Sequence, residues 1–331
     1  MSVQLLECKS FQNSCLPEGF HDFASTVYLQ WYINTVCPYH CEYCYVRQTT
    51  DRWGYMSRSL DQKAVYDLIE RAPYKNIGIT LLGGEPTAHP DFWIIVDTLT
   101  KMPRVYVDVI TNGFQSKEFF YEGLTSLPNR QKEKLRFEFS YHTDTLPCLE
   151  KFMRKVNIVR GILPLGASVT VMASKNPHRL KDTQRVYEFI STIGIPVNLT
   201  FLIDPLEDQK PLDYDWSSYK FYLQGCPLTH FMKLKENGVE HVRALNDIEV
   251  YAKQWNAFKG WKCYNNIFCI DIHNSIYRLC DNEHHGMVTS PDYWNFTNEV
   301  CTCHYVDSPC GTWHGKRTHQ SFLFVIEVQY G

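Results

Sequence analysis

The sequence has no apolar run long enough to cross a membrane and no large excess of charge of either sign. A transmembrane helix needs about 20 consecutive apolar residues, and no stretch of the 331 residues approaches that length. The formal net charge is −3, so no global positive field draws the chain to nucleic acid or to an anionic membrane surface. Charged residues interrupt residues 1–25, which therefore lack the apolar core of a signal peptide. We expect a cytoplasmic protein with no membrane partner.

Internal repeats and low-complexity tracts are also absent, and the chain is long enough to bury a barrel-sized core with an appendage. Thirteen residues are cysteines. In a small secreted domain such a number would indicate disulfides. In a large chain without a signal peptide it more often indicates metal or redox chemistry.

Short apolar runs alternate with amphipathic stretches over residues 26–204, which is typical of βαβ units. The predicted strands are Val27–Ile33, Ile77–Leu82, Val105–Ile110, Arg136–Tyr141, Ala167–Met172 and Val197–Ile203. The predicted helices are Leu60–Arg71, Pro90–Lys101, Ser116–Ser126, Cys148–Arg160 and Asp182–Ile193. This order predicts an α/β fold with a partial (β/α)6 barrel resembling part of a TIM barrel. Functional residues of such barrels lie at the carboxyl ends of the strands.

The pattern changes after Asp204, where a polar stretch with two prolines reads as a linker. Helical stretches are predicted near Trp216–Gln224 and Asn246–Phe258, followed by a segment rich in Cys, His and Asn. We therefore expect three parts, an N-terminal extension (1–25), the barrel (26–204) and a smaller domain (205–331) that depends on metal more than on a large apolar core.

Three cysteines with the spacing C-x3-C-x2-C, Cys37, Cys41 and Cys44, directly follow the first predicted strand, and Tyr43 precedes the third. Three thiolates this close can hold three irons of a [4Fe–4S] cube and leave the fourth iron without a protein ligand. A zinc site normally has four ligands in short pairs, and the nearest further thiols are remote in sequence. The stretch resembles the cluster motif of the radical S-adenosylmethionine (radical SAM) superfamily. The resemblance implies that S-adenosylmethionine binds at the open iron, with Tyr43 beside its adenine.

Gly83, Gly84, Glu85 and Pro86 follow the second predicted strand. Paired glycines let a backbone approach a ligand closely, and a carboxylate accepts hydrogen bonds from an ammonium group. In isolation such a sequence is an ordinary turn. One strand after the three cysteines, it resembles the superfamily motif that holds the methionine amino group of S-adenosylmethionine.

Polar residues also end the third and fourth predicted strands. Thr111 and Asn112 belong to an Ile-Thr-Asn-Gly sequence frequent at this place in the family, and Ser140 and His142 end the fourth strand. Such groups can reach the ribose and carboxylate of S-adenosylmethionine, with Ser140 the preferred candidate. The alternative is that they cap the following helices or turns, and for His142 the sequence favours this alternative.

The C-terminal cysteines fall into two groups, Cys263-x5-Cys269-x10-Cys280 and Cys301-x-Cys303-x6-Cys310, with His314 four residues later. They resemble the auxiliary-cluster domain, SPASM or the shorter Twitch, of many radical SAM enzymes. The resemblance implies one auxiliary [4Fe–4S] cluster held by the first group, with Cys310 or else Cys303 as fourth ligand, and a hairpin that brings Cys280 to it.

The second group departs from the family spacing, C-x2-C-x5-C, and histidine stands where another cysteine is expected. Four alternatives therefore remain open at this point, namely one auxiliary cluster, a cluster with a Cys3His zinc site, two clusters, or a wholly structural zinc domain.

For the activity, the resemblance implies reductive cleavage of S-adenosylmethionine to a 5′-deoxyadenosyl radical that abstracts a hydrogen atom from a substrate. A flavodoxin or ferredoxin would supply the electron. Only about 25 residues precede the first predicted strand, whereas peptide-modifying relatives commonly carry a larger leader-binding domain there. We therefore expect a small molecule, nucleoside or nucleobase as substrate, with a peptide as the alternative. A non-catalytic iron–sulfur carrier would not need the Gly83–Pro86 motif. We assign no catalytic side chain.

Overall fold

The computed structural model describes part of the chain, and every structural statement below refers to that part. The described residues are 3–6, 26–41, 43, 44, 46, 47, 54–145, 148–173, 176–201, 230–236, 239–245, 262–263, 267–278, 284–290, 294, 301–302 and 323–328.

Six parallel strands make up most of a nine-stranded sheet. In sheet order they are β2 (Thr26–Asn34), β3 (Asn76–Gly83), β4 (Val105–Thr111), β5 (Leu135–His142), β6 (Ala167–Ala173) and β7 (Val197–Phe201). Each strand pairs in parallel with the next one along the chain. The partial (β/α)6 barrel predicted from the sequence is therefore confirmed.

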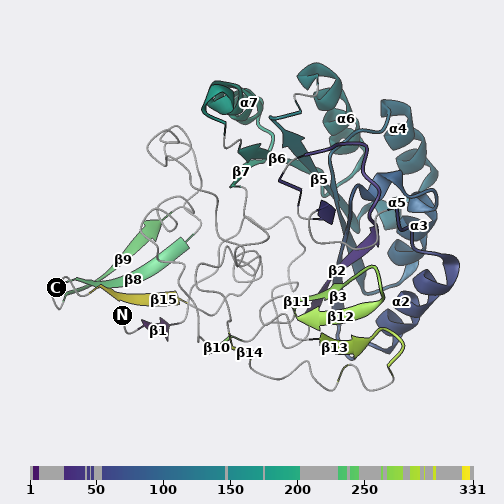
Figure 1. The fold of residues 1–331 in the computed structure, drawn as a ribbon, viewed down its shortest axis with the longest axis horizontal. Helices are drawn as coiled ribbons and strands as arrows, with labels where there is room; N and C mark the ends of the chain where they lie inside the picture. The colour runs from purple at the N-terminus through teal and green to yellow at the C-terminus, as the bar shows by residue number, and fades with distance from the viewer. Residues whose placement is uncertain are drawn as a thin grey trace.

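Helices connect these strands and lie along the outer side of the sheet (Figure 1). They are α2 (Ser59–Arg71), α3 (Phe92–Lys101), α4 (Lys117–Ser126), α5 (Asn129–Lys132), α6 (Leu149–Ile162) and α7 (Leu180–Thr192), with 3₁₀ turns at Pro86–Ala88 and Pro177–Arg179. All five predicted helices are present. The sequence did not predict α5, because a single helical turn is too short to show a helical period.

The apolar core lies between the sheet and the helices. On β4 and β5, buried and half-buried residues alternate, as the two-residue period of a strand requires. Phe137 and Phe139 face the helices, where Phe120 lies 5.9 and 5.5 Å from them between ring centroids. The intervening residues are polar except Ile110, and Arg136 on β5 donates two hydrogen bonds to Asp108 on β4 (3.1 and 2.7 Å). The face turned away from the helices is therefore mostly polar on these strands.

A hairpin from the C-terminal third of the chain continues the same sheet. Strand β11 (Ile267–Ile270) pairs in parallel with β2, β12 (Ser275–Arg278) pairs antiparallel with β11, and β13 (His284–Met287) follows. The turn contains Asn274 at φ 61°, a conformation that asparagine tolerates better than most residues. The hairpin predicted before Cys280 is confirmed, although Cys280 itself lies outside the described residues.

Two further sheets lie outside the barrel. One has the order β1 (Val3–Leu6), β15 (Leu323–Val328), β8 (His230–Glu236) and β9 (Val239–Leu245), and the other pairs β10 (Lys262–Cys263) with β14 (Cys301–Thr302). The predicted linker after Asp204 and the predicted helices 216–224 and 246–258 lie outside the described residues. The domain boundaries stay predictions. No helix within the described ranges is long and apolar enough to cross a membrane.

Candidate functional site

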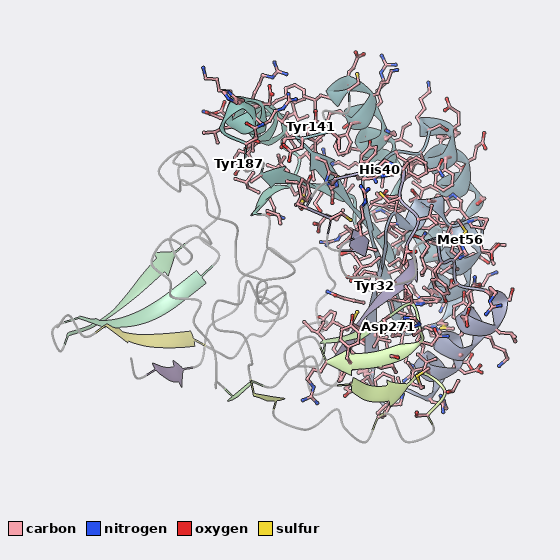
Figure 2. All side chains as sticks on the ribbon, in the orientation of Figure 1. Tyr32, His40, Met56, Tyr141, Tyr187 and Asp271 are labelled. Carbon is pink, nitrogen blue, oxygen red and sulfur yellow. The ribbon has the colours of Figure 1, made fainter. Side chains whose placement is uncertain are left out.

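The three-cysteine loop begins directly after β2, at the end of the sheet where the parallel strands finish. The backbone N–H of Cys44 donates to the carbonyl oxygen of Cys41 (3.2 Å), and that of Tyr39 donates to the sulfur of Cys37 (3.4 Å). Cys41 is buried, while Cys37 and Cys44 are half-buried. Figure 2 labels His40, which lies within this loop. The local turns thus place the three cysteines in one loop at the carboxyl end of β2.

Backbone hydrogen bonds join the loop to the Gly-Gly-Glu-Pro turn after β3. The N–H of Gly84 donates to the carbonyl oxygen of Asn34 (3.0 Å), and the N–H of Glu85 donates to that of Val36 (2.7 Å). The side-chain amide of Asn34 in turn donates to the carbonyl oxygen of Glu85 (2.9 Å). The two motifs that the sequence analysis singled out therefore form one structural unit.

The two glycines are required by this junction. A Cβ at Gly83 would lie 2.7 Å from the carbonyl oxygen of Asn34, and one at Gly84 would lie 2.6 Å from those of Thr35 and Val36. From the sequence, Gly83 and Gly84 were expected to let the backbone approach a ligand closely. In the structure, the close neighbour is the backbone that leads into the cysteine loop.

The Glu85 carboxylate is buried at the junction and accepts four hydrogen bonds. Three reach one oxygen, from the backbone N–H of Thr87 (3.1 Å), its hydroxyl (2.6 Å) and the hydroxyl of Thr111 (2.6 Å), and the backbone N–H of Asn112 reaches the other (2.6 Å). Burial raises the pKa of Glu85, and these hydrogen bonds oppose that shift. In the part of the chain that the structure describes, no ion pair includes Glu85. A buried carboxylate held by neutral donors suits a ligand that brings an ammonium group.

The loop offers three thiols, a donor set that suits an iron–sulfur cluster. Burial raises the pKa of Cys37 to about 12 and also raises that of Cys41, so a metal is needed to keep these sulfurs deprotonated. Among the described side chains, no three His, Cys, Asp or Glu residues gather closely enough to hold a single metal ion. A cluster does not need such a gathering, because each cysteine binds a different iron.

His142, at the end of β5, packs against the cysteine loop. Its Nδ1 lies 2.8 Å from the Tyr43 hydroxyl and 3.6 Å from the Cys41 sulfur, and its ring meets that of Tyr39 edge-on at 6.0 Å between centroids. Burial lowers the pKa of His142 to about 4, so the ring is neutral at pH 7. The sequence favoured a capping role for His142 at a helix or turn, which is wrong for its side chain. No local pattern could have shown this contact, because it joins residues about 100 positions apart.

The other predicted contacts of S-adenosylmethionine lie at the same end of the sheet. Ser140 is half-buried, two residues before His142 and hence on the same face of β5. Thr111 and Asn112 hold the Glu85 carboxylate, and the side-chain amide of Asn112 points to the sulfur of Cys37 (3.5 Å). Thr111 and Asn112 therefore contact the junction, and the contact of all three residues with S-adenosylmethionine stays a prediction.

The auxiliary-cluster residues are only partly described. The strand pair β10–β14 places Cys263 opposite Cys301. Cys269 lies on β11 opposite Tyr277, and burial raises the pKa of its thiol to about 12. The other predicted ligands, Cys280, Cys303 and Cys310, lie outside the described residues with His314. The predicted ligand set of this cluster stays a prediction.

In a comparison with protein families, residues 31–128 match the family model described as the Radical SAM superfamily. This part of the chain is therefore a radical SAM domain, and the resemblance to that superfamily is confirmed, whereas the resemblance of the C-terminal cysteines to a SPASM or Twitch domain stays a prediction. The superfamily uses a [4Fe–4S] cluster and S-adenosylmethionine, as the two motifs predicted. Comparison with curated protein sequences finds no match.

Comparison with solved structures identifies the same fold over most of the chain. A structure of anSMEcpe with bound S-adenosylmethionine has a TM-score of 0.54 and 15% identity, covering 83% of this chain and 81% of that chain. A structure of anSMEcpe with S-adenosylmethionine and the Cp18Cys peptide has a TM-score of 0.53 and 14% identity, covering 82% of this chain and 81% of that chain. At this identity the similarity shows the fold alone.

Proposed function

We propose that this chain, whose residues 31–128 form a radical SAM domain, reductively cleaves S-adenosylmethionine and uses the product radical to modify a substrate. The observation that carries the proposal is the hydrogen-bonded junction between the cysteine loop and Glu85. These hydrogen bonds join the segment that leads into the three-cysteine loop to the turn that carries a buried carboxylate, which supports a role of both in one site. A protein that only carries electrons would not need the buried Glu85 carboxylate, for which we propose an ammonium group as ligand.

In this proposal, Cys37, Cys41 and Cys44 hold three irons of a [4Fe–4S] cluster. When bound, the cluster and S-adenosylmethionine supply one electron and a 5′-deoxyadenosyl radical that abstracts a hydrogen atom from the substrate. Glu85 accepts hydrogen bonds from the methionine ammonium group and so orients the sulfonium. Ser140, half-buried on the strand that also carries His142, contacts the ribose or the carboxylate of S-adenosylmethionine.

For the remaining residues of the site we propose supporting roles. Tyr43 packs beside the adenine, and the contact of its hydroxyl with His142 fixes its ring. Pro86 begins the 3₁₀ turn that positions the Glu85 carboxylate over the N–H of Thr87. Gly83 and Gly84 allow the turn to approach the cysteine loop.

We propose a small molecule, nucleoside or nucleobase as substrate, modified by oxidation, cross-linking, isomerisation or epimerisation. A peptide substrate is the second candidate, and it is supported by one observation. The anSMEcpe structure that shares this fold over 82% of the chain was solved with a peptide bound. A flavodoxin or ferredoxin would donate the electron. The auxiliary cluster of residues 205–331, held by Cys263, Cys269, Cys280 and either Cys310 or Cys303, would accept an electron from the product radical, bind substrate or brace the domain.

The test is S-adenosylmethionine cleavage by the anaerobically reconstituted protein with dithionite. We expect 5′-deoxyadenosine, measured by liquid chromatography and mass spectrometry, and no product from a variant with alanine at Cys37, Cys41 and Cys44. Cys148→Ser, which changes an exposed thiol remote in sequence from the loop, is the control and should retain full cleavage. Undiminished cleavage by the triple variant would end the assignment.

A further inference from the structure

The sulfur of Cys37 accepts two N–H groups of the protein. One is the backbone N–H of Tyr39 in the same loop (3.4 Å), and the other is the side-chain amide of Asn112 (3.5 Å), which follows β4 and is 75 residues away in sequence. Sulfur is larger than oxygen, so such contacts are longer than the usual N–H···O distance. The Asn112 contact joins the cysteine loop to a different strand.

The orientation of the Asn112 amide follows from its other contacts. Its Oδ1 accepts the backbone N–H of Phe114 (3.0 Å), and its own backbone N–H is held by Glu85 (2.6 Å). A flipped amide would turn its NH₂ group toward the Phe114 N–H and its oxygen toward the cysteine sulfur, and both contacts would be repulsive. The residue is 6% exposed, so water does not replace these bonds. The N–H group of the amide therefore faces the sulfur.

We infer that the Asn112 amide acts as a hydrogen-bond donor to the Cys37 thiolate and thereby raises the reduction potential of the cluster held by this loop. The inference rests on the proposed function, because it needs a cluster at Cys37, Cys41 and Cys44. Adding one electron makes the cluster and its thiolates more negative, and a donor to a thiolate sulfur stabilises the more negative state. Burial strengthens the effect, because a hydrogen bond acts in a lower dielectric there than in water. Asn112 is thus a positioning and tuning residue rather than a direct contact of the reacting atoms.

The arrangement also links the two halves of the site. The same residue supports the Glu85 carboxylate through its backbone and the Cys37 sulfur through its side chain. A substitution of the side chain leaves the backbone bond to Glu85 in place. The potential of the cluster can therefore be changed separately from the carboxylate that we assign to the methionine ammonium group.

The experiment is a redox titration of the reconstituted protein, followed by electron paramagnetic resonance. The signal of this cluster is identified as the one absent from the variant with alanine at all three loop cysteines. Asn112→Leu removes the donor without adding charge, and Asn112→Asp removes it, keeps the acceptor for the Phe114 N–H and adds a negative charge. Asn198→Leu and Asn198→Asp, on β7, are the matched controls.

We expect both Asn112 variants to keep their iron and to titrate at a more negative potential than the wild type, with the aspartate variant shifted further, while both Asn198 variants stay unchanged. A leucine variant that titrates with the wild type would overturn the inference, even if the aspartate variant shifts, because charge alone would then explain the result. If the leucine variant loses its cluster, Asn112→Ala is titrated in its place, and a potential equal to that of the wild type would again overturn the inference. Failure of the wild type to form the cluster or 5′-deoxyadenosine would instead refute the proposed function.

Discussion

Replacing Gly84 with alanine should disturb the contact between the cysteine loop and the turn that carries Glu85. The added Cβ would lie 2.6 Å from the carbonyl oxygens of both Thr35 and Val36. Both neighbours are backbone atoms, so the chain must shift where it forms the hydrogen bonds Gly84–Asn34 (3.0 Å) and Glu85–Val36 (2.7 Å). Overpacking of this kind costs about 1–3 kcal/mol, and each hydrogen bond lost adds about 0.5–1.5 kcal/mol.

The overpacking and the lost hydrogen bonds should lower both the stability of the protein and its affinity for S-adenosylmethionine. We expect overpacking alone to lower the melting temperature of the metal-free protein by about 2–12 °C, at about 2–4 °C for each kcal/mol, and each hydrogen bond lost to lower it further. The affinity for S-adenosylmethionine, measured by equilibrium dialysis on the reconstituted protein, should fall as well, because Glu85 moves with the turn.

Gly161→Ala is the matched control for this substitution. Gly161 lies in helix α6, and an added Cβ there has no neighbour within 4 Å. Alanine stabilises a helix by about 0.5–1 kcal/mol relative to glycine, so this variant should melt at the same temperature or higher. Wild-type melting and wild-type affinity in Gly84→Ala would refute the packing argument.

Three further predictions concern titration and metal content. Thr111→Val removes a donor to Glu85 and should raise its already elevated pKa further. Binding of S-adenosylmethionine should weaken as the pH falls through the pKa of Glu85, because the protonated group no longer attracts the ammonium group. In binding measurements over a series of pH values, the variant should therefore lose affinity at a higher pH than the wild type. Burial lowers the pKa of His89, so the unfolded chain binds more protons below about pH 6.5 and stability falls on acidification. His89→Gln should therefore show a flatter melting temperature between about pH 7 and 5 than the wild type. Cys280→Ser should lower both soluble yield and iron, whereas Cys148→Ser should lower neither. The wild type should hold about eight irons, four for each cluster, and about four irons with one zinc would contradict an auxiliary cluster.

Local patterns in the sequence were sufficient for the barrel. Each strand from β2 to β6 was predicted within one residue at either end, because a strand buried on one face and packed against helices keeps a clear apolar pattern. The cysteine loop was found from its spacing, and the Gly-Gly-Glu-Pro turn from its position one strand later and its resemblance to the superfamily motif. Their placement at one end of the sheet followed from the rule that parallel strands with helical crossovers all finish at the same edge.

Contacts between distant residues were not predictable in this way. The sequence did not show that β11 pairs beside β2, because pairing between strands more than 200 residues apart depends on the register and twist of the whole sheet. It also favoured the wrong role for His142, since a polar residue at a strand end has the same local pattern whether it caps a turn or packs on a neighbouring loop.

The sequence by itself therefore determined the six barrel strands and their longer helices and singled out the cysteine and Gly-Gly-Glu-Pro motifs, because those depend on local period, spacing and residue chemistry. Only the tertiary structure decided how the motifs meet. It showed that Gly84 is glycine because of the carbonyl groups before Cys37, and that the Asn112 amide faces a cysteine sulfur. These are contacts across three neighbouring strands, and their geometry exists only when the packed sheet brings the strand ends within hydrogen-bonding distance.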